Sequence, residues 1–415
     1  MVSKLQPLRG THDVLPEEAR RHRHVVETAL AVAGRHGYGE IVTPIFEMTE
    51  VFQRTLGESS DVVAKEMYTF ADRGGDGVTL RPEGTAGVAR AVISGGLQQA
   101  VPLKFFYQGP MFRYERPQKG RQRQFHQIGA ELIGVPGPLG DVEVIAMGAQ
   151  ILDALGILDK TTLHLNTLGD QESRLAYRAA LVAYFDGHRG TLSEDSLRRL
   201  TVNPLRILDS KDDGDRAVVA DAPAFGDFLN DASRRFFEDV KDGLTALGIA
   251  IHLDPRLVRG LDYYCHSAFE FVTDALGAQG TVMAGGRYDG LIATMGGPPT
   301  PGVGWAAGIE RLAMLLADMP PPARPIAIVP LGAPAERRAL ALAQDLRRRG
   351  LTIELGFSGN MGKRLKRADK LNARAAVILG DDELQRGVAA VRDLDAGAQE
   401  EVALDRLEDA LARFA

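Results

Sequence analysis

The stretch FRYERPQKGRQRQFHQIGAEL, residues 112–132, restricts the fold more than any other part of the chain. Residues 104–107 and 111–115 are extended and rich in aromatic side chains, and residues 125–132 alternate in the period-two pattern of a β-strand. That alternation separates Gln127 and Glu131 from the mainly apolar face of the strand. The segment therefore predicts a β-hairpin whose polar face carries Arg113, Gln127 and Glu131.

The loop of this predicted hairpin is basic. From Arg113 to Arg123 it holds five cationic side chains and one acid, Glu115, and so carries four net positive charges. Phosphate is a natural partner for such a cluster, although a run of charges is also typical of a solvated hairpin tip. Gln127 and Glu131 favour phosphate binding, because polar groups on a strand face that should be buried need partners.

Two further segments carry arginines in informative places. RGLDYY, residues 259–264, sets an arginine beside two tyrosines in a strand context, which suits a small polar molecule held next to a polyanion. In GIERLAMLL, residues 308–316, the apolar side chains recur at helical spacing and place Arg311 in the first turn, off the packed stripe. An arginine there suits phosphate, and an ordinary structural arginine is equally consistent.

Composition sets outer limits on function. A chain of 415 residues predicts two to three domains, and a net charge of −6 argues against a surface coated for non-specific nucleic-acid binding. The single cysteine, Cys265, excludes an intramolecular disulfide and a CxxC-type zinc site. The sequence has neither an apolar signal core at its start nor an apolar run of bilayer length. We expect a cytoplasmic protein.

The chain is expected to have three blocks. Residues 1–165 alternate helical and strand-like segments, including a helix at 17–36 and a strand at 40–44, and residues 168–247 are mainly helical. A Pro-rich break at 319–325 precedes strands at 326–330, 352–355 and 375–379 and helices at 334–349 and 362–371. Such alternation predicts a small α/β domain with a largely parallel sheet.

Three other motifs do not carry the function they suggest. GVGWAAG, residues 302–308, fits a dinucleotide fingerprint, but GGPPTP precedes it where a Rossmann unit needs an apolar strand. SGNMGKR, residues 358–364, lacks the glycine spacing and the Ser/Thr of a P-loop. His22 and His24 lie two apart on a helix and point in different directions, so we expect surface histidines and no metal ligands.

The sequence resembles the histidyl-tRNA synthetase family of class II aminoacyl-tRNA synthetases over nearly its whole length. The resemblance is carried by RGTHDVLP, TPIFE with Pro44, TLRPEGTA, the hairpin segment, RGLDYY, AGGRYDGL and GIERL. The hairpin and GIERL match class markers, motifs 2 and 3, whereas RGLDYY with LRPEGT is specific to the histidine enzyme and its close relatives. The family implies an α/β (α+β) fold: a six-stranded antiparallel catalytic sheet at 1–167 and 248–320, a helical insertion at 168–247, an α/β anticodon-binding domain at 325–415, and a homodimer.

The resemblance also implies an ATP-dependent histidine–tRNA ligase, which makes histidyl-adenylate and transfers the histidyl group to the 3′ end of tRNA(His). Residues implied to bind L-histidine are Glu83, Gly84, Thr85, Gln127, Glu131, Tyr263 and Tyr264. Arg113 and Arg259 would hold the α-phosphate of ATP, Arg311 the γ-phosphate, and Mg²⁺ would bridge the phosphates. The acceptor end of tRNA would meet Arg116, Gln118, Lys119, Arg121 and Arg123, and the C-terminal domain would offer Lys363, Arg364, Lys366, Arg367 and Lys370 to RNA.

Departures from the family pattern are few. Cys265, His266 and Trp305 are unexpected near the pocket, and they leave its wall undefined. The main alternative is a non-catalytic, histidine-sensing regulatory subunit of ATP phosphoribosyltransferase. Such paralogues typically lack the anticodon domain and lose active-site residues, whereas this chain keeps both. Another class II synthetase is disfavoured by RGLDYY and by Glu131 on the pocket face.

Overall fold

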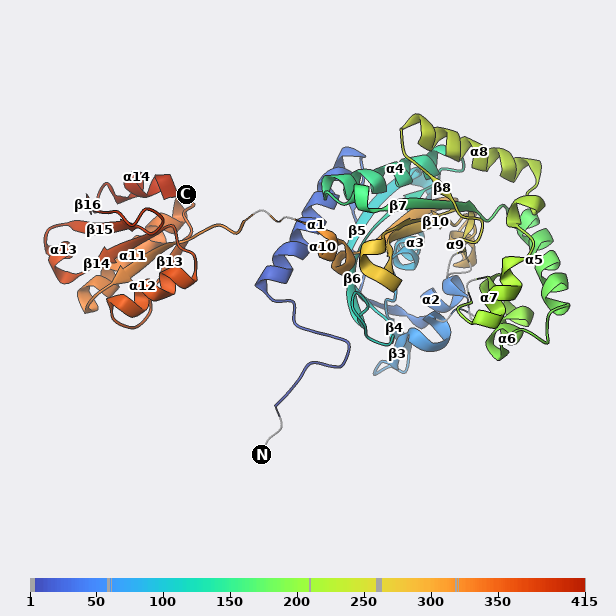
Figure 1. Ribbon diagram of the computed structural model, residues 1–415, viewed down its shortest axis with the longest axis horizontal. Coiled ribbons are helices and arrows are strands. Elements are labelled where there is room, and N and C mark those ends of the chain that lie inside the picture. Colours follow the sequence, from blue (N-terminus) through green and yellow to red (C-terminus); the bar gives the residue numbers. More distant parts are fainter. Residues whose placement is uncertain are drawn as a thin grey trace. The chain divides into compact units, whose positions relative to one another are not determined.

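The computed structural model describes residues 4–57, 60, 62–208, 210–258, 263–317, 319 and 321–414. The chain divides into two compact units, Met1–Asp318 and Met319–Ala415, and each has its own sheet (Figure 1). Within these described ranges, no helix combines the length and the apolar character needed to cross a membrane.

An eight-stranded sheet organises the first unit in the order β1-β5-β6-β11-β10-β9-β7-β8. Its six central strands are antiparallel, which confirms the expected catalytic sheet: β5 (Leu103–Phe112), β6 (Gln124–Ile133), β11 (Gly302–Gly308), β10 (Thr281–Arg287), β9 (Cys265–Val272) and β7 (Thr162–Thr167). Short strands β1 (Gly39–Glu40) and β8 (His252–Leu253) extend the edges in parallel. The strand expected at 40–44 is therefore mostly loop.

Helices cover one face of this sheet (Figure 1). Helix α4 (Leu139–Ala154) lies on β11, β10 and β6, while α1 (Pro16–Arg35) and α8 (Asp231–Ala246) pack against α4. Because α4 is enclosed on several sides, apolar residues occur all round it. Trp305 belongs to this interface, since its indole Nε1 donates to the Val144 carbonyl of α4 at 3.0 Å.

The opposite face is only partly covered, by α3 (Thr85–Ser94) and α9 (Leu291–Thr294). Paired residues in adjacent antiparallel strands point to the same side, so the register shows which side chains form this face. One row runs Gly129, Ala306, Ala284, Glu270, and the next runs Glu131, Gly304, Gly286, Ala268. Most of these residues are glycine or alanine, so other side chains can approach this part of the sheet closely: Tyr107 lies over Gly129, Glu131 beside Gly304 and Tyr264 over Gly286.

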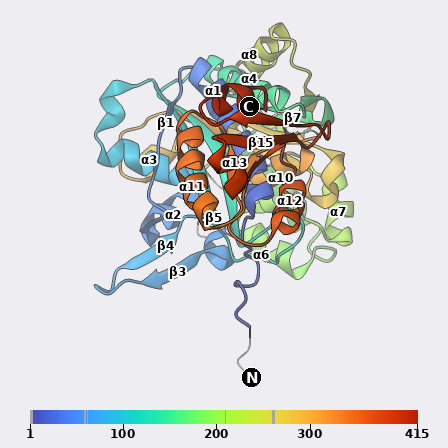
Figure 2. The ribbon, with the colours of Figure 1, turned by 90° about the vertical axis from the view of Figure 1, so that its left-hand side faces the viewer.

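A small antiparallel sheet of β2 (Phe46–Met48), β4 (Gly77–Leu80) and β3 (Tyr68–Ala71) lies next to helix α2 (Thr49–Leu56). The β3–β4 hairpin projects from the lower left in Figure 2. Large apolar side chains are exposed on this sheet and on the segment before it: Val42, Ile45, Phe46, Met48 and Phe70. An exposed apolar group of this size is typical of an interface.

The segment expected to be a helical insertion contains α5 (Gln171–Asp186), α6 (Glu194–Val202) and α7 (Asp213–Ala220). These helices share an apolar cluster of their own, which includes Leu181, Phe185 and Leu200. Helix α8 behaves differently, because it contacts α4 and β9, and a side chain at its Gly243 would lie 2.6 Å from Val142. The last helix of the predicted insertion thus packs against α4 and the large sheet.

The second unit is built on a five-stranded sheet in the order β13 (Ile353–Leu355), β12 (Ile326–Pro330), β14 (Ala375–Leu379), β15 (Val388–Asp393), β16 (Gln399–Ala403). The first three strands are parallel, as predicted, and β15 and β16 are antiparallel. The sequence did not indicate this last pair, because β16 is exposed and rich in glutamate and lacks an apolar period.

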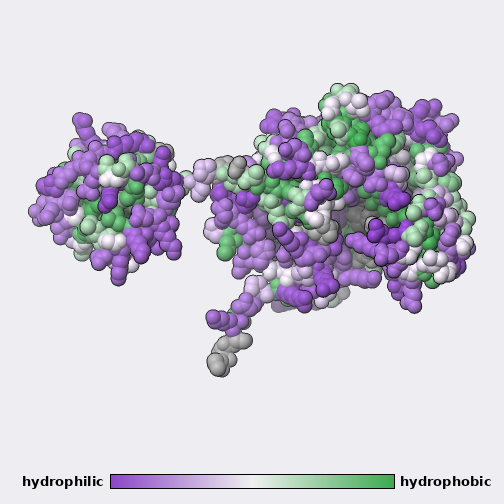
Figure 3. Space-filling model, in the orientation of Figure 1, coloured by the Kyte–Doolittle hydropathy of each residue, from purple (hydrophilic) through white to green (hydrophobic). Residues whose placement is uncertain are grey.

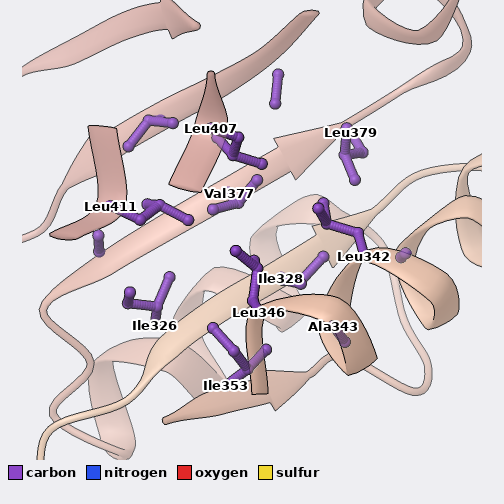
Figure 4. Close-up of a cluster of buried hydrophobic side chains, with 14 of the residues drawn as sticks. Ile326, Ile328, Leu342, Ala343, Leu346, Ile353, Val377, Leu379, Leu407 and Leu411 are labelled. Atoms are coloured by element: carbon purple, nitrogen blue, oxygen red, sulfur yellow. The ribbon is translucent and has the colours of Figure 1, made fainter. Parts of the chain in front are cut away.

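Helices α11 (Ala333–Arg348), α12 (Met361–Lys370), α13 (Asp381–Gln385) and α14 (Leu407–Leu411) complete this unit. The face seen in Figure 3 is mostly hydrophilic, with apolar side chains at its centre. Figure 4 shows the buried cluster between the strands and α11 and α14, to which Ile328, Leu346, Val377 and Leu407 contribute. The unit therefore has a hydrophobic core of its own.

Candidate active site

A cavity of about 260 Å³ opens on the partly covered face of the large sheet. It brings together seven side chains that the sequence predicted for the site, from five separate segments of the chain. They are Glu83, Thr85, Arg113, Gln127, Tyr263, Tyr264 and Arg311. Arg259, predicted to hold phosphate, lies outside the described residues, as do its neighbours 260–262.

The β5–β6 hairpin aims its polar face at this cavity, as predicted. Gly109 pairs with Gln127 and Phe105 pairs with Glu131, so the alternation inferred from the sequence holds along β6. The side-chain oxygen Oε1 of Gln127 is buried and accepts no hydrogen bond from any described residue. A buried amide oxygen of this kind is available to a ligand that donates a hydrogen bond.

The carboxylate of Glu83 is held by the first turn of α3. It accepts hydrogen bonds from the backbone nitrogens of Thr85 and Ala86, each at 2.8 Å. Its pKa is raised by burial, although those two backbone hydrogen bonds oppose the shift. Gly84 fits beneath Tyr107, because a Cβ at Gly84 would lie 2.3 Å from that ring.

Glu131 is completely buried behind this carboxylate. It accepts a 2.6 Å hydrogen bond from the Thr85 hydroxyl and a short one from the hydroxyl of Tyr288. Burial raises the pKa of Glu131 to about 8. Gly304 on the neighbouring strand makes room for it, since a Cβ there would lie 1.8 Å from Glu131 Oε2.

Tyrosines form the wall around these two acids. Tyr263 and Tyr264 have ring centroids 4.5 Å apart, and Tyr263 also meets Tyr288 edge-on at 5.8 Å. Tyr107 fills the space above Gly129, where a Cβ would lie 2.2 Å from its ring. The sequence predicted the first pair but assigned no role to Tyr107 or Tyr288. In the sequence, Tyr107 lies in an aromatic-rich strand segment and Tyr288 in AGGRYDGL. Neither location shows which way the ring points.

Guanidinium groups line the other end of the cavity. Arg113 donates to the Pro82 carbonyl at 2.9 Å, and Arg311 donates to the carbonyls of Gly120 at 3.1 Å and Thr281 at 2.7 Å. Arg121 reaches the same region and forms an ion pair with Glu115. The pKa of Arg311 is lowered, first by burial and then by the charge of Arg121. Three neighbouring cations against two acids, Glu115 and Glu270, leave a net positive charge that suits a polyanion.

The remainder of the hairpin loop divides into two groups. Arg116, Gln118 and Lys119 are exposed. Arg123 instead lies 3.8 Å over the ring of Tyr114, and its backbone nitrogen donates to the Gly10 carbonyl at 2.7 Å. The residues predicted to contact tRNA thus lie in three places. Arg116, Gln118 and Lys119 form an exposed tip, Arg121 lines the cavity, and Arg123 packs against the N-terminal segment.

Cys265 and His266, the unexpected neighbours of the pocket, line a second cavity of about 720 Å³. Burial raises the pKa of the Cys265 thiol to about 12. His266 has a positive φ of 44° and stacks on Phe236 of α8 with the ring centroids 4.5 Å apart. Neither residue lines the cavity that holds Glu83 and Arg113, so the candidate site does not depend on them directly.

The basic residues predicted for RNA in the second unit are not equivalent. Arg364 is buried and donates to the carbonyls of Gly356 and Gly359, each at 2.7 Å, and to Glu336. Its position is that of a structural arginine that fixes the loop before α12. The remaining members of the set are exposed on α12: Lys363, Lys366, Arg367 and Lys370.

Comparisons with known proteins agree with this architecture. The chain matches the family model described as histidyl-tRNA synthetase at residues 10–173 and 198–312, and the model described as anticodon binding domain at 325–413. It is 67% identical over 414 residues to a histidine–tRNA ligase of Rhodospirillum rubrum and 59% identical over 414 residues to one of Gluconacetobacter diazotrophicus, with 100% of each chain covered.

Solved structures show the same relationship. The S. aureus histidyl-tRNA synthetase superposes with a TM-score of 0.83 at 36% identity, over 98% of this chain and 99% of that one. A Bacillus halodurans C protein, named as an ATP phosphoribosyltransferase regulatory subunit/histidyl-tRNA synthetase, has a TM-score of 0.66 at 22% identity, over 92% of this chain and 99% of that one, which shows the fold alone.

The antiparallel sheet, the hairpin that carries Arg113 and the α10 (Ile309–Leu315) arginine Arg311 define a class II aminoacyl-tRNA synthetase. Within that class the matched family model and the relatives are decisive. The chain belongs to the histidyl-tRNA synthetase family.

Proposed function

We propose that this chain is a histidine–tRNA ligase. In the first step the carboxylate of L-histidine attacks the α-phosphate of ATP, which gives histidyl-adenylate and releases pyrophosphate. In the second step the terminal ribose hydroxyl of tRNA(His) takes the histidyl group and AMP leaves. Neither step needs a nucleophilic side chain, so positioning and electrostatics carry the catalysis.

One observation supports this proposal above the others. A single cavity has two ends of different chemistry, with a buried acid, an amide and tyrosines at one end and three guanidinium groups at the other. The first end suits a small cationic and polar molecule, and the second suits phosphates. A reaction that joins an amino acid to a nucleotide needs both ends within one cavity.

The acidic end is proposed to hold histidine. Glu83, beside Gly84 and Thr85, receives the α-ammonium. Oε1 of Gln127, to which no described residue donates, accepts from the same group or orients the carboxylate. Glu131 and Tyr264 bond the imidazole, and Tyr263 lines its pocket. Polar groups matched in this way discriminate by about 10⁴ to 10⁵ against analogues that leave them unpaired.

The cationic end is proposed to hold ATP. Arg113 and Arg259 contact the α-phosphate, where charge builds as the carboxylate attacks, and Arg311 contacts the γ-phosphate. Mg²⁺ takes oxygen ligands, and the carboxylate of Glu270 lines this end of the cavity and suits the ion. When bound with the phosphates, the ion would offset their charge.

The tRNA is proposed to contact both units. Its acceptor end meets the exposed tip of the hairpin loop, and its anticodon meets the unit that matches the anticodon-binding model. The proposed domains are a catalytic domain at 1–167 and 248–320, an insertion at 168–247 and an anticodon-binding domain at 325–415. A cytoplasmic location fits this role in translation.

A homodimer is also proposed, formed through the exposed apolar group on and before the small sheet. Phe46 is 60% exposed and Phe70 is 50% exposed, and Val42, Ile45 and Met48 extend the same apolar surface. A second copy of the chain would remove these side chains from water. The segment TPIFE, which the family associates with dimerisation, includes Ile45 and Phe46.

Histidine-dependent ATP–pyrophosphate exchange tests the enzymatic proposal. Purified protein should exchange label only when histidine is present. A protein that binds histidine without any exchange would be a sensor of the regulatory-subunit kind, and exchange with another amino acid would redirect the assignment.

Arg259→Ala gives a sharper test of the phosphate site. Exchange should be lost while the melting temperature stays unchanged, because the residue is proposed to act on the transition state rather than on the fold. Near-normal turnover in this variant would refute its assigned role.

A further inference from the structure

Imidazole and carboxylate groups gather beside β6 on the face opposite Gln127. His22 comes from α1, His126 from β6 and Glu310 from α10. The sequence predicted a surface histidine at position 22, and that prediction is wrong, because α1 packs against α10 and leaves the His22 side chain only 12% exposed. Its ring lies 5.8 Å from that of His126.

The geometry of this cluster resembles an incomplete metal site. Glu310 accepts from the backbone nitrogen of His126 at 2.9 Å, and its Oε1 lies 2.8 Å from His126 Nδ1. One ligand atom from each of the three residues lies within 4.8 Å of the other two. Ligand atoms of a tetrahedral zinc site are about 3.3 Å apart, so closure needs a side-chain movement of about 1.5 Å.

The surroundings leave room for an ion and further ligands. A cavity of about 230 Å³ adjoins His22 and Glu310 and is also lined by His12 and Glu18. His12 Nε2 lies 3.0 Å from Glu18 Oε1, which in turn lies 3.9 Å from His22 Nε2. Arg21 also lines the cavity, but its guanidinium donates to the carbonyls of Ala313 and Leu316 at the end of α10.

We propose that His22, His126 and Glu310 bind a divalent transition-metal ion of the zinc class. Two imidazoles and one carboxylate are the ligand set of an open zinc site, whose remaining position takes water or another ligand. Imidazole ligands select zinc, copper and nickel over magnesium. The site lies on the opposite face of β6 from Gln127, and its adjoining cavity shares Gly120 and Gln122 with the proposed histidine and ATP cavity. The bound ion would join α1, β6 and α10.

Metal titration of the chelator-treated full chain tests this proposal. Co²⁺ binding, followed by visible absorption, and Zn²⁺ binding, followed by calorimetry, should each give one ion per chain. His22→Ala should weaken binding at least about tenfold, whereas His24→Ala, on the same helix, should bind as the wild type does. Equal affinity of the wild type and the His22→Ala variant, or no stoichiometric binding, would overturn the proposal.

His22→Cys provides a positive test that does not depend on a loss. The variant should still bind one Co²⁺ and should gain a near-ultraviolet thiolate-to-metal band, because cysteine thiolate is a zinc-class ligand. Cys265 should not contribute, because its buried thiol has a pKa of about 12, and the wild type serves as the control for it. A folded variant without that band would contradict the proposal. Histidine-dependent exchange by the metal-free protein reports separately on the enzymatic function.

Discussion

Glu131 affects both the chemistry of the site and the stability of the fold. It is fully buried and accepts hydrogen bonds from Thr85 and Tyr288, yet its pKa is raised to about 8 because burial outweighs those contacts. At neutral pH the free protein therefore holds mainly the protonated carboxyl group. A ligand that donates a hydrogen bond to Glu131 forms the stronger bond when this carboxyl group is ionised.

A pH-dependent stability difference should follow from Glu131. Between the usual glutamate pKa and about 8, the folded chain keeps a proton that the unfolded chain has released, so the free energy of unfolding falls as pH rises. This effect amounts to about 5 kcal/mol across the window. Glu131→Gln removes it, so the variant should gain stability relative to the wild type from pH 5 to pH 8, as thermal melts would measure. A constant difference over that range would contradict the raised pKa.

Gly304→Ala should damage the site by a steric clash alone. The added Cβ would lie 1.8 Å from Glu131 Oε2 and 2.4 Å from the Ala130 carbonyl, which cannot both move away. We expect a destabilisation of about 1–3 kcal/mol and a raised KM for histidine in the exchange assay.

The matched control for this change is Gly39→Ala at the sheet edge, where a Cβ meets nothing within 4 Å. This variant should melt and exchange as the wild type does. If the two alanine variants behaved alike, the close approach of Gly304 to Glu131 would not be the cause.

At the level of elements, the small sheet predicts an assembly phenotype. A double variant, Phe46→Asp with Phe70→Asp, places charges on the exposed apolar group and should convert a dimer into a monomer, because burying an unpaired carboxylate is costly. Light scattering after size exclusion would measure the mass.

Leu139→Asp is the control for that variant. Leu139 is 77% exposed, but it lies at the first residue of α4, away from the small sheet. This change should leave the mass unaltered. A dimer that persists in the double variant would exclude the proposed interface.

Local periodicity explains how much of the site the sequence could predict. The alternation in β6 indicated that Gln127 and Glu131 share a face, and helical spacing placed Arg311 off the packed stripe. Tyr107 and Tyr288 could not be found in this way, because their contacts depend on the register between strands far apart in the chain. The sequence predicted a tRNA contact for Arg121, whereas the structure places it in the cavity. Periodicity could not predict this, because its ion pair with Glu115 depends on how the loop folds back.

On the scale of the whole molecule, the two units should be separable. Residues 319–415 have their own apolar cluster, so this fragment should melt cooperatively by itself. The shortened chain 1–318 retains every cavity residue named for histidine and ATP, and it should keep histidine-dependent exchange while transfer to tRNA falls sharply. Loss of exchange in a shortened chain with unchanged circular dichroism would show that the second unit contributes to the first step.

The glycines of the large sheet that lie beneath Tyr107, Glu131 and Tyr264 limit how this enzyme could be redesigned. Substrate range is usually widened by trimming large pocket residues, but Gly129, Gly304 and Gly286 have no side chain to remove. Extra space for a bulkier amino acid must come from the surrounding tyrosines, Tyr107 or Tyr288. A smaller residue at 107 would lose the packing on Gly129, and one at 288 would lose the hydrogen bond to Glu131. A saturation mutagenesis screen should therefore find Gly129, Gly286 and Gly304 almost invariant, although none of them has a side chain to take part in the reaction.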